Sequence, residues 1–277
     1  MAERSIAGRS IAEPRVLVLR APGTNCDVET AYAFEVAGAQ VQRLHVNRIL
    51  EQPGRLKEFQ VLCLPGGFSY GDDIAAGRIL GNQIRHHLHD RLQDFCDDGG
   101  LILGICNGFQ VLMNSGILLP PALAGDGAAL SPATLTWNDS GKFEDRWVNL
   151  QVASDKSVFL SGIESLYLPI AHAEGKFVAR DDQQLNDLDK AGRLVLRYVN
   201  DGAAAGNGAG AVPYPSNPNG SQRNVAGLSD STGRVLGLMP HPERHIDPTQ
   251  HPRWTRGDAN EVGDGLAVFA NAVAYFR

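Results

Sequence analysis

Short apolar runs alternate with longer amphipathic segments through the first half of the chain. Four of the runs predict strands, at residues 16–19, 41–46, 61–64 and 101–105. Three segments with helical spacing accompany them, at residues 25–37, 78–97 and 107–114. The run 61–64 is apolar at every position, as in a strand that is covered on both faces. This alternation indicates a mostly parallel sheet flanked by helices, with ligands bound beyond the carboxyl ends of its strands.

The second half of the chain has a different pattern, with short strands and few helices. Six strand-like runs are separated by turns, at residues 134–137, 147–152, 166–171, 194–199, 225–228 and 235–239. Residues 229–233 predict a hairpin loop between the last two runs, and residues 265–276 predict a closing amphipathic helix. We therefore predict an α/β fold in which additional antiparallel strands extend the parallel sheet.

Length and loop composition set the predicted domain organisation. A chain of 277 residues can form one large domain or two small ones, and we favour a single domain over residues 15–277. Residues 1–14 lack an apolar central segment, so they predict a flexible leader and not a secretory signal. Residues 202–220 are rich in Gly, Ala, Asn and Pro, and a loop of this length is usually functional or disordered.

Charge and cysteine content exclude several classes of function. The formal net charge of −6 and the pI near 5.7 give no basic field for nucleic acid or a membrane surface, so we expect a small molecule or a protein as partner. The four cysteines show no Cys-x-x-Cys spacing, which gives no sign of a zinc site or a disulfide framework and fits a reducing cytoplasm. His86, His87 and His89 lack partners at ligand spacing, so we predict a solvated helix face and no metal site.

The segment Gly104-Ile105-Cys106-Asn107-Gly108 lies where a predicted buried strand meets a helix. A nucleophile flanked by glycines at this junction is typical of the sharp turn that exposes a catalytic side chain, because glycine lets the strand and the helix approach closely. The helix N-terminus would favour the Cys106 thiolate by about 0.3–1 kcal/mol, so a nearby imidazole is expected to complete its activation. A buried structural cysteine is the alternative, which the glycine pattern disfavours.

His241 is the strongest candidate for the base. It directly follows the strand-like run 235–239 and would therefore lie at the same edge of the sheet as Cys106. Prolines on both sides hold the backbone extended, and Glu243 can accept the imidazole N–H and fix the tautomer. His172 also follows a predicted strand, and we retain it as the rival base and as a residue that lines the site.

Acyl transfer also requires donors for the oxyanion that develops on the substrate. The backbone N–H of Asn107 and one from the Gly66-Gly67 turn would converge from two adjacent strand ends, although the turn by itself is also compatible with a purely structural role. Asp72 and Asp73 follow this turn, and we interpret them as exposed loop charge.

Together these motifs resemble the triad (class I) glutamine amidotransferases, in which a Pro-Gly-Gly turn, a Gly-x-Cys-x-Gly-x-Gln elbow and a late His-Pro-Glu occur in this order. More narrowly, five segments resemble the family of glutaminase subunits of phosphoribosylformylglycinamidine synthase: residues 65–72, 104–110, 171–177, 217–221 and 237–244. The resemblance covers most of the chain from Val16 onward and implies the flavodoxin-like fold of class I glutaminases.

The resemblance also implies roles for individual residues. The implied triad is Cys106, His241 and Glu243. Gly67 and Asn107 would donate oxyanion N–H groups. The remaining implied contacts with the substrate glutamine are Gly66, Phe68, Gln110 and His172.

The same resemblance implies a division of labour between subunits. Glutamine is hydrolysed through a glutamyl thioester, and ammonia passes to a separate synthetase subunit that uses ATP and Mg²⁺ to convert formylglycinamide ribotide to its amidine. A small accessory subunit is a further expected partner. This chain has no G-x-x-x-x-G-K-[ST] signature, so we expect no cofactor in it. The leader 1–14 and the loop 202–216 are longer than in the compact form of the family. We expect these two segments to affect how the synthetase subunit docks on this chain.

Two alternatives use the same fold. A free-standing amidase or γ-glutamyl peptidase would use the same triad without a partner, and the segments typical of the purine pathway argue against it. A non-catalytic redox-sensing protein would use only the elbow cysteine, which would leave His241 and Glu243 without a function.

Overall fold

The structure is a computed structural model that describes residues 11–123, 129–200, 210–257 and 260–277. Its centre is a nine-stranded mixed sheet with the strand order β2-β1-β3-β4-β13-β12-β11-β8-β9. Five strands form the parallel half: β2 (Gln40–His45), β1 (Arg15–Arg20), β3 (Val61–Leu64), β4 (Leu101–Ile105) and β13 (Val235–Leu238). Four strands extend it in antiparallel fashion: β12 (Val225–Ser229), β11 (Leu196–Val199), β8 (Glu144–Val152) and β9 (Ser165–His172).

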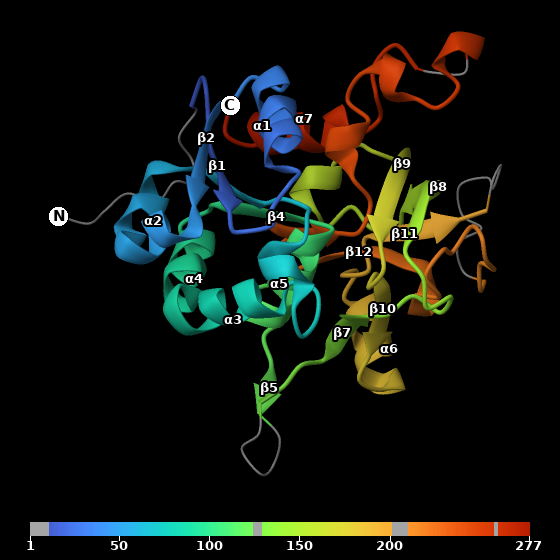
Figure 1. Cartoon of the computed structure of the whole chain (residues 1–277), viewed down its shortest axis with the longest axis horizontal. Helices are drawn as coiled ribbons and strands as arrows, with labels where there is room; N and C mark the ends of the chain where they lie inside the picture. The colour runs from blue at the N-terminus through green and yellow to red at the C-terminus, as the bar shows by residue number, and fades with distance from the viewer. Residues whose placement is uncertain (1–10, 124–128, 201–209, 258–259) are drawn as a thin grey trace.

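Helices cover both faces of the parallel half. Figure 1 shows α1 and α7 on one side of the sheet and α3, α4 and α5 on the other. The helices of the described chain are α1 (Asp27–Val36), α2 (Val46–Glu51), α3 (Arg78–His87), α4 (His89–Asp97), α5 (Asn107–Ser115), α6 (Asp182–Lys190) and α7 (Leu266–Ala274). Phe34 of α1 and Phe269 of α7 meet edge to face, with ring centroids 4.8 Å apart, which joins the two helices over the sheet.

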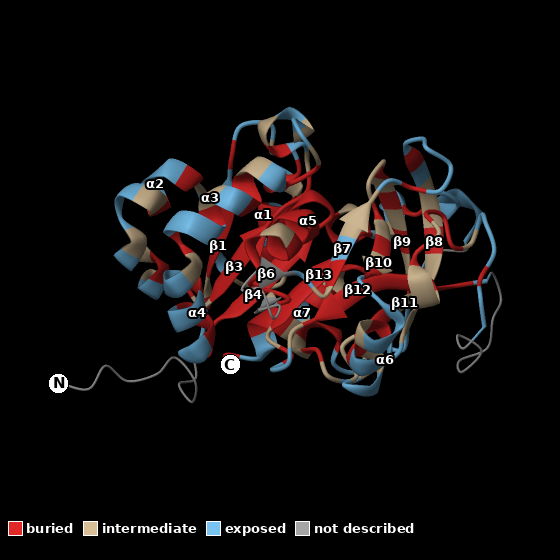
Figure 2. Ribbon diagram, turned by 90° about the horizontal axis from the view of Figure 1, so that it is seen from below, coloured by how far each residue is buried: buried red, intermediate tan, exposed pale blue. Residues whose placement is uncertain are grey.

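The predicted α/β fold, a mostly parallel sheet with additional antiparallel strands in the second half, is confirmed. Every residue of β3, β4 and β13 is buried, as expected for strands that are covered on both faces (Figure 2). The hairpin expected around 229–233 joins β12 to β13. Two small sheets complete the fold: β10 (Lys176–Ala179) with β7 (Ala133–Thr136), and β5 (Ala122–Leu123) with β6 (Ala129–Leu130).

Several predicted elements differ from the structure. The helix predicted over 78–97 is two helices, because the backbone of Leu88 leaves the helical region at φ −126° and ψ −4° while its side chain stays buried. No glycine or proline marks this break in the sequence. Helix α1 is capped by Cys26 and not by Asn25. Helix α6 was missed because it buries only Leu185 and Leu188 and is otherwise polar.

The segment before β1 is held to the domain by backbone hydrogen bonds, one of which joins it to the C-terminal end of the chain. Residues 1–10 of the predicted leader and residues 202–209 of the predicted loop lie outside the described residues. The N–H of Ile11 donates to the carbonyl of Phe276 (2.7 Å), and the carbonyl of Pro14 accepts the N–H of Gln40 (3.0 Å).

Within the described chain, we find no helix with the length and apolar character that crossing a membrane requires.

Helix α5 lies unusually close to the two strands beneath it. A Cβ atom added at Gly108 would stand 1.8 Å from the carbonyl oxygen of Leu64 in β3. A Cβ added at Gly104 of β4 would stand 2.7 Å from the carbonyl oxygen of Gly108. Both contacts are with backbone, which cannot rotate away, so glycine is required at both positions for the helix to begin where it does.

We therefore expect Gly108→Ala to lower the free energy of unfolding by about 1–3 kcal/mol or more, because the added methyl group forces α5 away from β3. Gly54→Ala is the matched control, since nothing lies within 4 Å of a Cβ at that position, and it should change stability by less than about 1 kcal/mol. Urea unfolding of both variants measures the difference. Equal midpoints for the two variants would contradict the close packing.

Candidate active site

The elbow at Cys106 is a strained turn between β4 and α5. Cys106 has φ +50° and ψ −105°, in a region that residues with a side chain rarely adopt. Its N–H donates to Leu238 of β13 (2.8 Å), and its carbonyl accepts from Phe109 and Gln110 in the first turn of α5. The Sγ atom lies 3.6 Å from the carbonyl oxygen of Ala171, at the end of β9. The turn therefore holds the sulfur where three strand ends meet.

His241 and Glu243 form a buried pair next to this turn. The Nδ1 atom of His241 lies 2.6 Å from Oε1 of Glu243, and the two residues are 2% and 1% exposed. Burial opposes a charged imidazole, but the Glu243 carboxylate and the nearby Cys106 sulfur outweigh it and hold the pKa of His241 well above its ordinary value. Nε2 makes no hydrogen bond of ordinary geometry within the described chain. The Cys106 sulfur lies close enough to raise the pKa of the imidazole, so His241 can take the proton of the thiol.

The Gly66-Gly67 turn packs against the imidazole of His241. A Cβ added at Gly66 would stand 2.8 Å from Cε1 of His241 and 3.1 Å from the sulfur of Cys26. Gly66 therefore packs against the imidazole, whereas Gly67 and the half-exposed Phe68 line the pocket beside Cys106. Gly67 has φ +137°, a conformation that glycine adopts without strain.

A narrow pocket of about 40 Å³ opens beside the sulfur of Cys106. Its lining contains five residues that the sequence predicted for the site: Gly67, Phe68, Cys106, Gln110 and His172. It also contains five residues that were not predicted: Asp72, Ala76, Ala171, Ala173 and Glu174. The pocket therefore brings together the Pro-Gly-Gly turn, the elbow and the segment after β9.

His172 lies in the pocket wall with its ring fixed by Asn138. Nδ1 of His172 is 3.1 Å from Oδ1 of Asn138, an oxygen that also accepts the N–H of Gly175 (3.2 Å). The amide nitrogen of Asn138 donates to two carbonyls, so its orientation is determined and Nδ1 of His172 carries the proton. Burial, together with charge on His241, lowers the pKa of His172 to about 3. His172 is thus neutral and has an acceptor atom at Nε2.

Asn107 and Gln110 organise the pocket through their side-chain amides. The Nδ2 atom of Asn107 donates to Oδ1 of Asp72 (2.9 Å) and to Oε1 of Gln110 (3.1 Å). Nε2 of Gln110 donates to the carbonyl of Glu174 (2.6 Å). Asp73 is exposed, but the interpretation of Asp72 as exposed loop charge is wrong, because its carboxyl is half-buried in the pocket wall. Burial raises the pKa of Asp72 to about 6.

Cys26 is a second thiol at the site that the sequence did not predict. Arg244 donates to its sulfur from Nη2 (3.1 Å), and the sulfur lies beside the His241 ring. Burial raises the pKa of the Cys26 thiol. Ligand atoms of Cys26, His241 and Glu243 lie within 4.8 Å of one another, so this set could hold a metal ion. No local motif identifies Cys26, because His241 and Arg244, which lie beside its sulfur, are more than 200 positions away in the chain.

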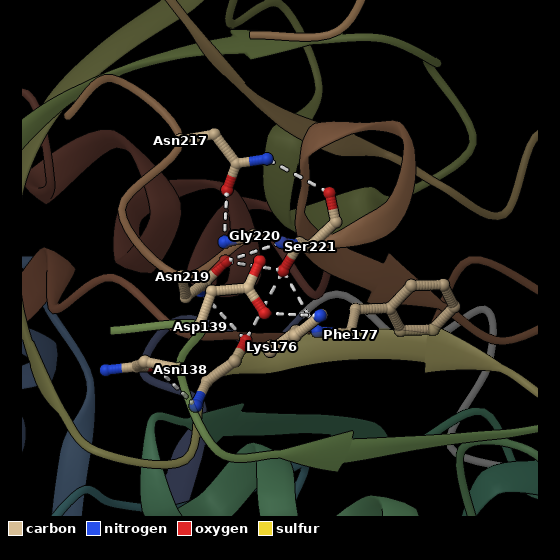
Figure 3. A network of polar contacts seen from close by, with 9 residues as sticks. Asn138, Asp139, Lys176, Phe177, Asn217, Asn219, Gly220 and Ser221 are labelled. Carbon is tan, nitrogen blue, oxygen red and sulfur yellow. Dashed lines mark hydrogen bonds and ion pairs between the residues drawn. The ribbon is translucent and has the colours of Figure 1, made fainter. Parts of the chain in front are cut away.

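A polar network holds the segment that carries His172 and Glu174 (Figure 3). Nδ2 of Asn219 donates to the carbonyl of Gly175 (2.9 Å), and the hydroxyl of Ser221 accepts the N–H of Phe177 (2.9 Å). Lys176 forms an ion pair with Asp139. The Asn-Pro-Asn-Gly-Ser segment 217–221 therefore supports the pocket wall without lining it.

Comparisons with known proteins agree with this arrangement. Residues 13–276 match the model of the CobB/CobQ-like glutamine amidotransferase domain. The chain is 46% identical to the phosphoribosylformylglycinamidine synthase subunit PurQ of Dehalococcoides mccartyi, over 96% of this chain and 99% of that protein. It is 38% identical to the PurQ subunit of Archaeoglobus fulgidus, over 96% of this chain and 98% of that protein.

Solved structures show the same fold. A chain in the structure of PurLQS from Thermotoga maritima is 31% identical and superposes with a TM-score of 0.70, over 96% of this chain and 100% of that one. Because the family model and these relatives span nearly the whole sequence, the chain belongs to the CobB/CobQ-like glutamine amidotransferase family.

Proposed function

We propose that this protein is the glutaminase subunit of phosphoribosylformylglycinamidine synthase and supplies ammonia from glutamine to a synthetase subunit in purine biosynthesis. The observation that carries the proposal is a strained Cys106 that lines the pocket and lies beside the buried His241–Glu243 pair. The near full-length similarity to PurQ subunits gives the pathway.

The geometry supports a thioester mechanism. The sulfur of Cys106 attacks the carbonyl carbon of the glutamine side-chain amide while its proton passes to Nε2 of His241. The N–H groups of Asn107 and Gly67 stabilise the oxyanion of the tetrahedral intermediate. His241 then protonates the leaving nitrogen, the C–N bond breaks, and ammonia departs from a glutamyl thioester.

The second half of the reaction uses the same groups. His241, again neutral, takes a proton from water as the water attacks the thioester carbonyl, and the C–S bond breaks to release glutamate and regenerate the thiol. Glu243 holds the imidazole in one tautomer and stabilises its charged form throughout. Gln110 and His172 shape the pocket for the substrate.

The partners follow from the same proposal. We infer docking to a synthetase subunit, because a structure of PurLQS from Thermotoga maritima contains the similar chain, and we infer a small accessory subunit as well. ATP and Mg²⁺ belong to the synthetase in this proposal, and this chain works without a cofactor in the cytoplasm.

Cys106→Ala should lower glutamine hydrolysis at least about 10³-fold, because without the sulfur no thioester can form. Ammonia release, measured with and without the synthetase subunit, tests this. An unchanged thermal unfolding curve serves as the control for folding. Full activity in the variant would show that Cys106 is not the nucleophile.

His241→Ala should lower kcat by about 10²–10⁴-fold, since it removes the group that moves both protons. His172→Ala is the matched comparison, because this histidine is equally buried in the same site but stays neutral, and its kcat should fall much less. Steady-state kinetics of the two variants decide between the two candidate bases. Loss confined to the His172 variant would reverse the assignment.

Ammonium salt at high concentration should replace this chain in the synthesis of the amidine by the synthetase subunit, whereas glutamine should support synthesis only when this chain is present. The assay measures amidine formation with each nitrogen source. A free-standing amidase would hydrolyse glutamine rapidly alone and would fail to support synthesis at low glutamine.

A further inference from the structure

Three different metal-binding side chains meet next to the elbow, namely those of Cys26, His241 and Glu243. One ligand atom from each lies within 4.8 Å of the other two. The three residues are almost fully buried, at 1%, 2% and 1% exposure. A Cβ added at Gly66 would stand 3.1 Å from the sulfur of Cys26 and 2.8 Å from Cε1 of His241, so the thiol and the imidazole pack against the same glycine.

Two of these side chains have buried atoms without a partner. Oε1 of Glu243 lies at Nδ1 of His241, but Oε2 has no hydrogen-bond partner in the described chain. Nε2 of His241 has none of ordinary geometry either. Transfer of the Cys106 proton accounts for Nε2, whereas nothing in the triad uses Oε2. A buried carboxylate oxygen without a partner is unfavourable, and a bound cation would satisfy it.

The backbone holds the thiol and the imidazole in fixed positions. The N–H of Cys26 donates to the carbonyl of Gly66 (3.2 Å), and the carbonyl of Cys26 accepts the N–H and the hydroxyl of Thr30 (3.1 and 2.6 Å). The N–H of His241 donates to the carbonyl of Pro169 (2.8 Å). The arrangement is therefore preformed, and a ligand between these side chains would require no movement of the backbone.

The donor set matches the preferences of one metal ion. Sulfur, imidazole nitrogen and carboxylate oxygen together are typical ligands of Zn²⁺, whereas Mg²⁺ and Ca²⁺ require oxygen ligands. Ionised Cys26 and Glu243 carry two negative charges that balance the dication, and the thiol proton leaves to solvent when the ion binds. Bonds of about 2.0–2.3 Å place tetrahedral ligands about 3.5 Å apart, so side-chain shifts of about 1 Å suffice.

Arg244 is a cation beside this set, and it has two opposing effects. Its Nη2 atom donates to the sulfur of Cys26 (3.1 Å), which favours the thiolate that zinc binds but repels the ion itself. The ion pair between Arg244 and Glu29 is long (3.5 Å), and the two side chains are 37% and 36% exposed. Because an exposed pair of this kind contributes little, the guanidinium can turn away from the sulfur at small cost.

We propose that Cys26, His241 and Glu243 bind Zn²⁺ and that the bound ion inhibits the glutaminase. Whichever ring nitrogen binds the ion, His241 can no longer take the thiol proton. A metal on Nε2 occupies the lone pair that accepts the proton, and a metal on Nδ1 leaves the ring proton on Nε2. The inhibition rests on the proposed function, in which His241 is the base, whereas the binding of the ion does not.

The binding is tested with Co²⁺ as a spectroscopic probe in the full chain carrying Cys106→Ala, which removes the nucleophile as a ligand. A charge-transfer band from thiolate to cobalt should appear, and Zn²⁺ should abolish it by displacing the cobalt. Adding Cys26→Ser should remove the band. Adding Cys96→Ser should leave it, because this equally buried thiol lies on α4 outside the set.

A second variant keeps this test decisive if Cys26→Ser does not fold. Glu243→Gln retains the thiol but loses the carboxylate, so it should weaken the affinity of the Cys106→Ala chain for Co²⁺ at least about tenfold. Thermal unfolding curves identify which variants are folded. A band that survives Cys26→Ser, or an affinity that Glu243→Gln leaves unchanged, would overturn the site.

The inhibition is tested by glutamine hydrolysis in the complete complex of this chain and its synthetase partner, over a series of buffered free Zn²⁺ concentrations. Zinc should inhibit the wild type, and a chelator should restore its activity. Relative to its own rate without zinc, Cys26→Ser should need at least about tenfold more zinc for half-inhibition, and Cys96→Ser should behave as the wild type. Equal sensitivity of all three proteins would show that zinc acts elsewhere and would overturn the inhibitory role.

The two experiments separate this inference from the proposed function. A complex that does not hydrolyse glutamine, from a chain that binds cobalt through Cys26, overturns the function and supports the metal site. A complex that hydrolyses glutamine, from a chain in which no band depends on Cys26, overturns the metal site alone.

Discussion

The parallel pairing of β3, β4 and β13 is the constraint on which the site depends. Leu64 of β3 pairs with Gly104, and Leu238 of β13 pairs with Ile105, so all three strands end at the same edge of the sheet. The chain that leaves each strand supplies one part of the site, namely the glycine turn, the nucleophile or the base. Hydrogen bonds of the sheet thus bring together groups that lie far apart in the sequence.

The antiparallel half of the sheet has a different role, which is to close the pocket. Its outer strand β9 ends at His172, and Glu174 follows in the turn before β10. The loop 217–221 fixes this turn through Asn219 and Ser221, with each hydrogen bond in a buried setting. The parallel half therefore carries the reacting groups and the antiparallel half shapes what can reach them.

Local sequence signals predicted the parts of the site that depend on local geometry. The glycines around Cys106 indicated the elbow, since each serves a contact within a few residues or with the adjacent strand, and the proximity of His241 and Glu243 in sequence indicated their pairing. Cys26 and Asp72 could not be found in this way, because their roles arise only from tertiary contacts. The break between α3 and α4 at Leu88 likewise could not be predicted, because no glycine or proline marks it and the spacing of apolar residues is the same on both sides of it.

β9, the last strand of the sheet, contacts each part of the site. The carbonyl of Pro169 accepts the N–H of His241 (2.8 Å), the carbonyl of Ala171 contacts the sulfur of Cys106, and His172 ends the strand. β9 pairs with β8 on one side, and on its other side hydrogen bonds tie it to the segment that follows β13. Because β9 contacts the base, the nucleophile and the pocket wall, a substitution that shifts this strand would change the positions of all three together.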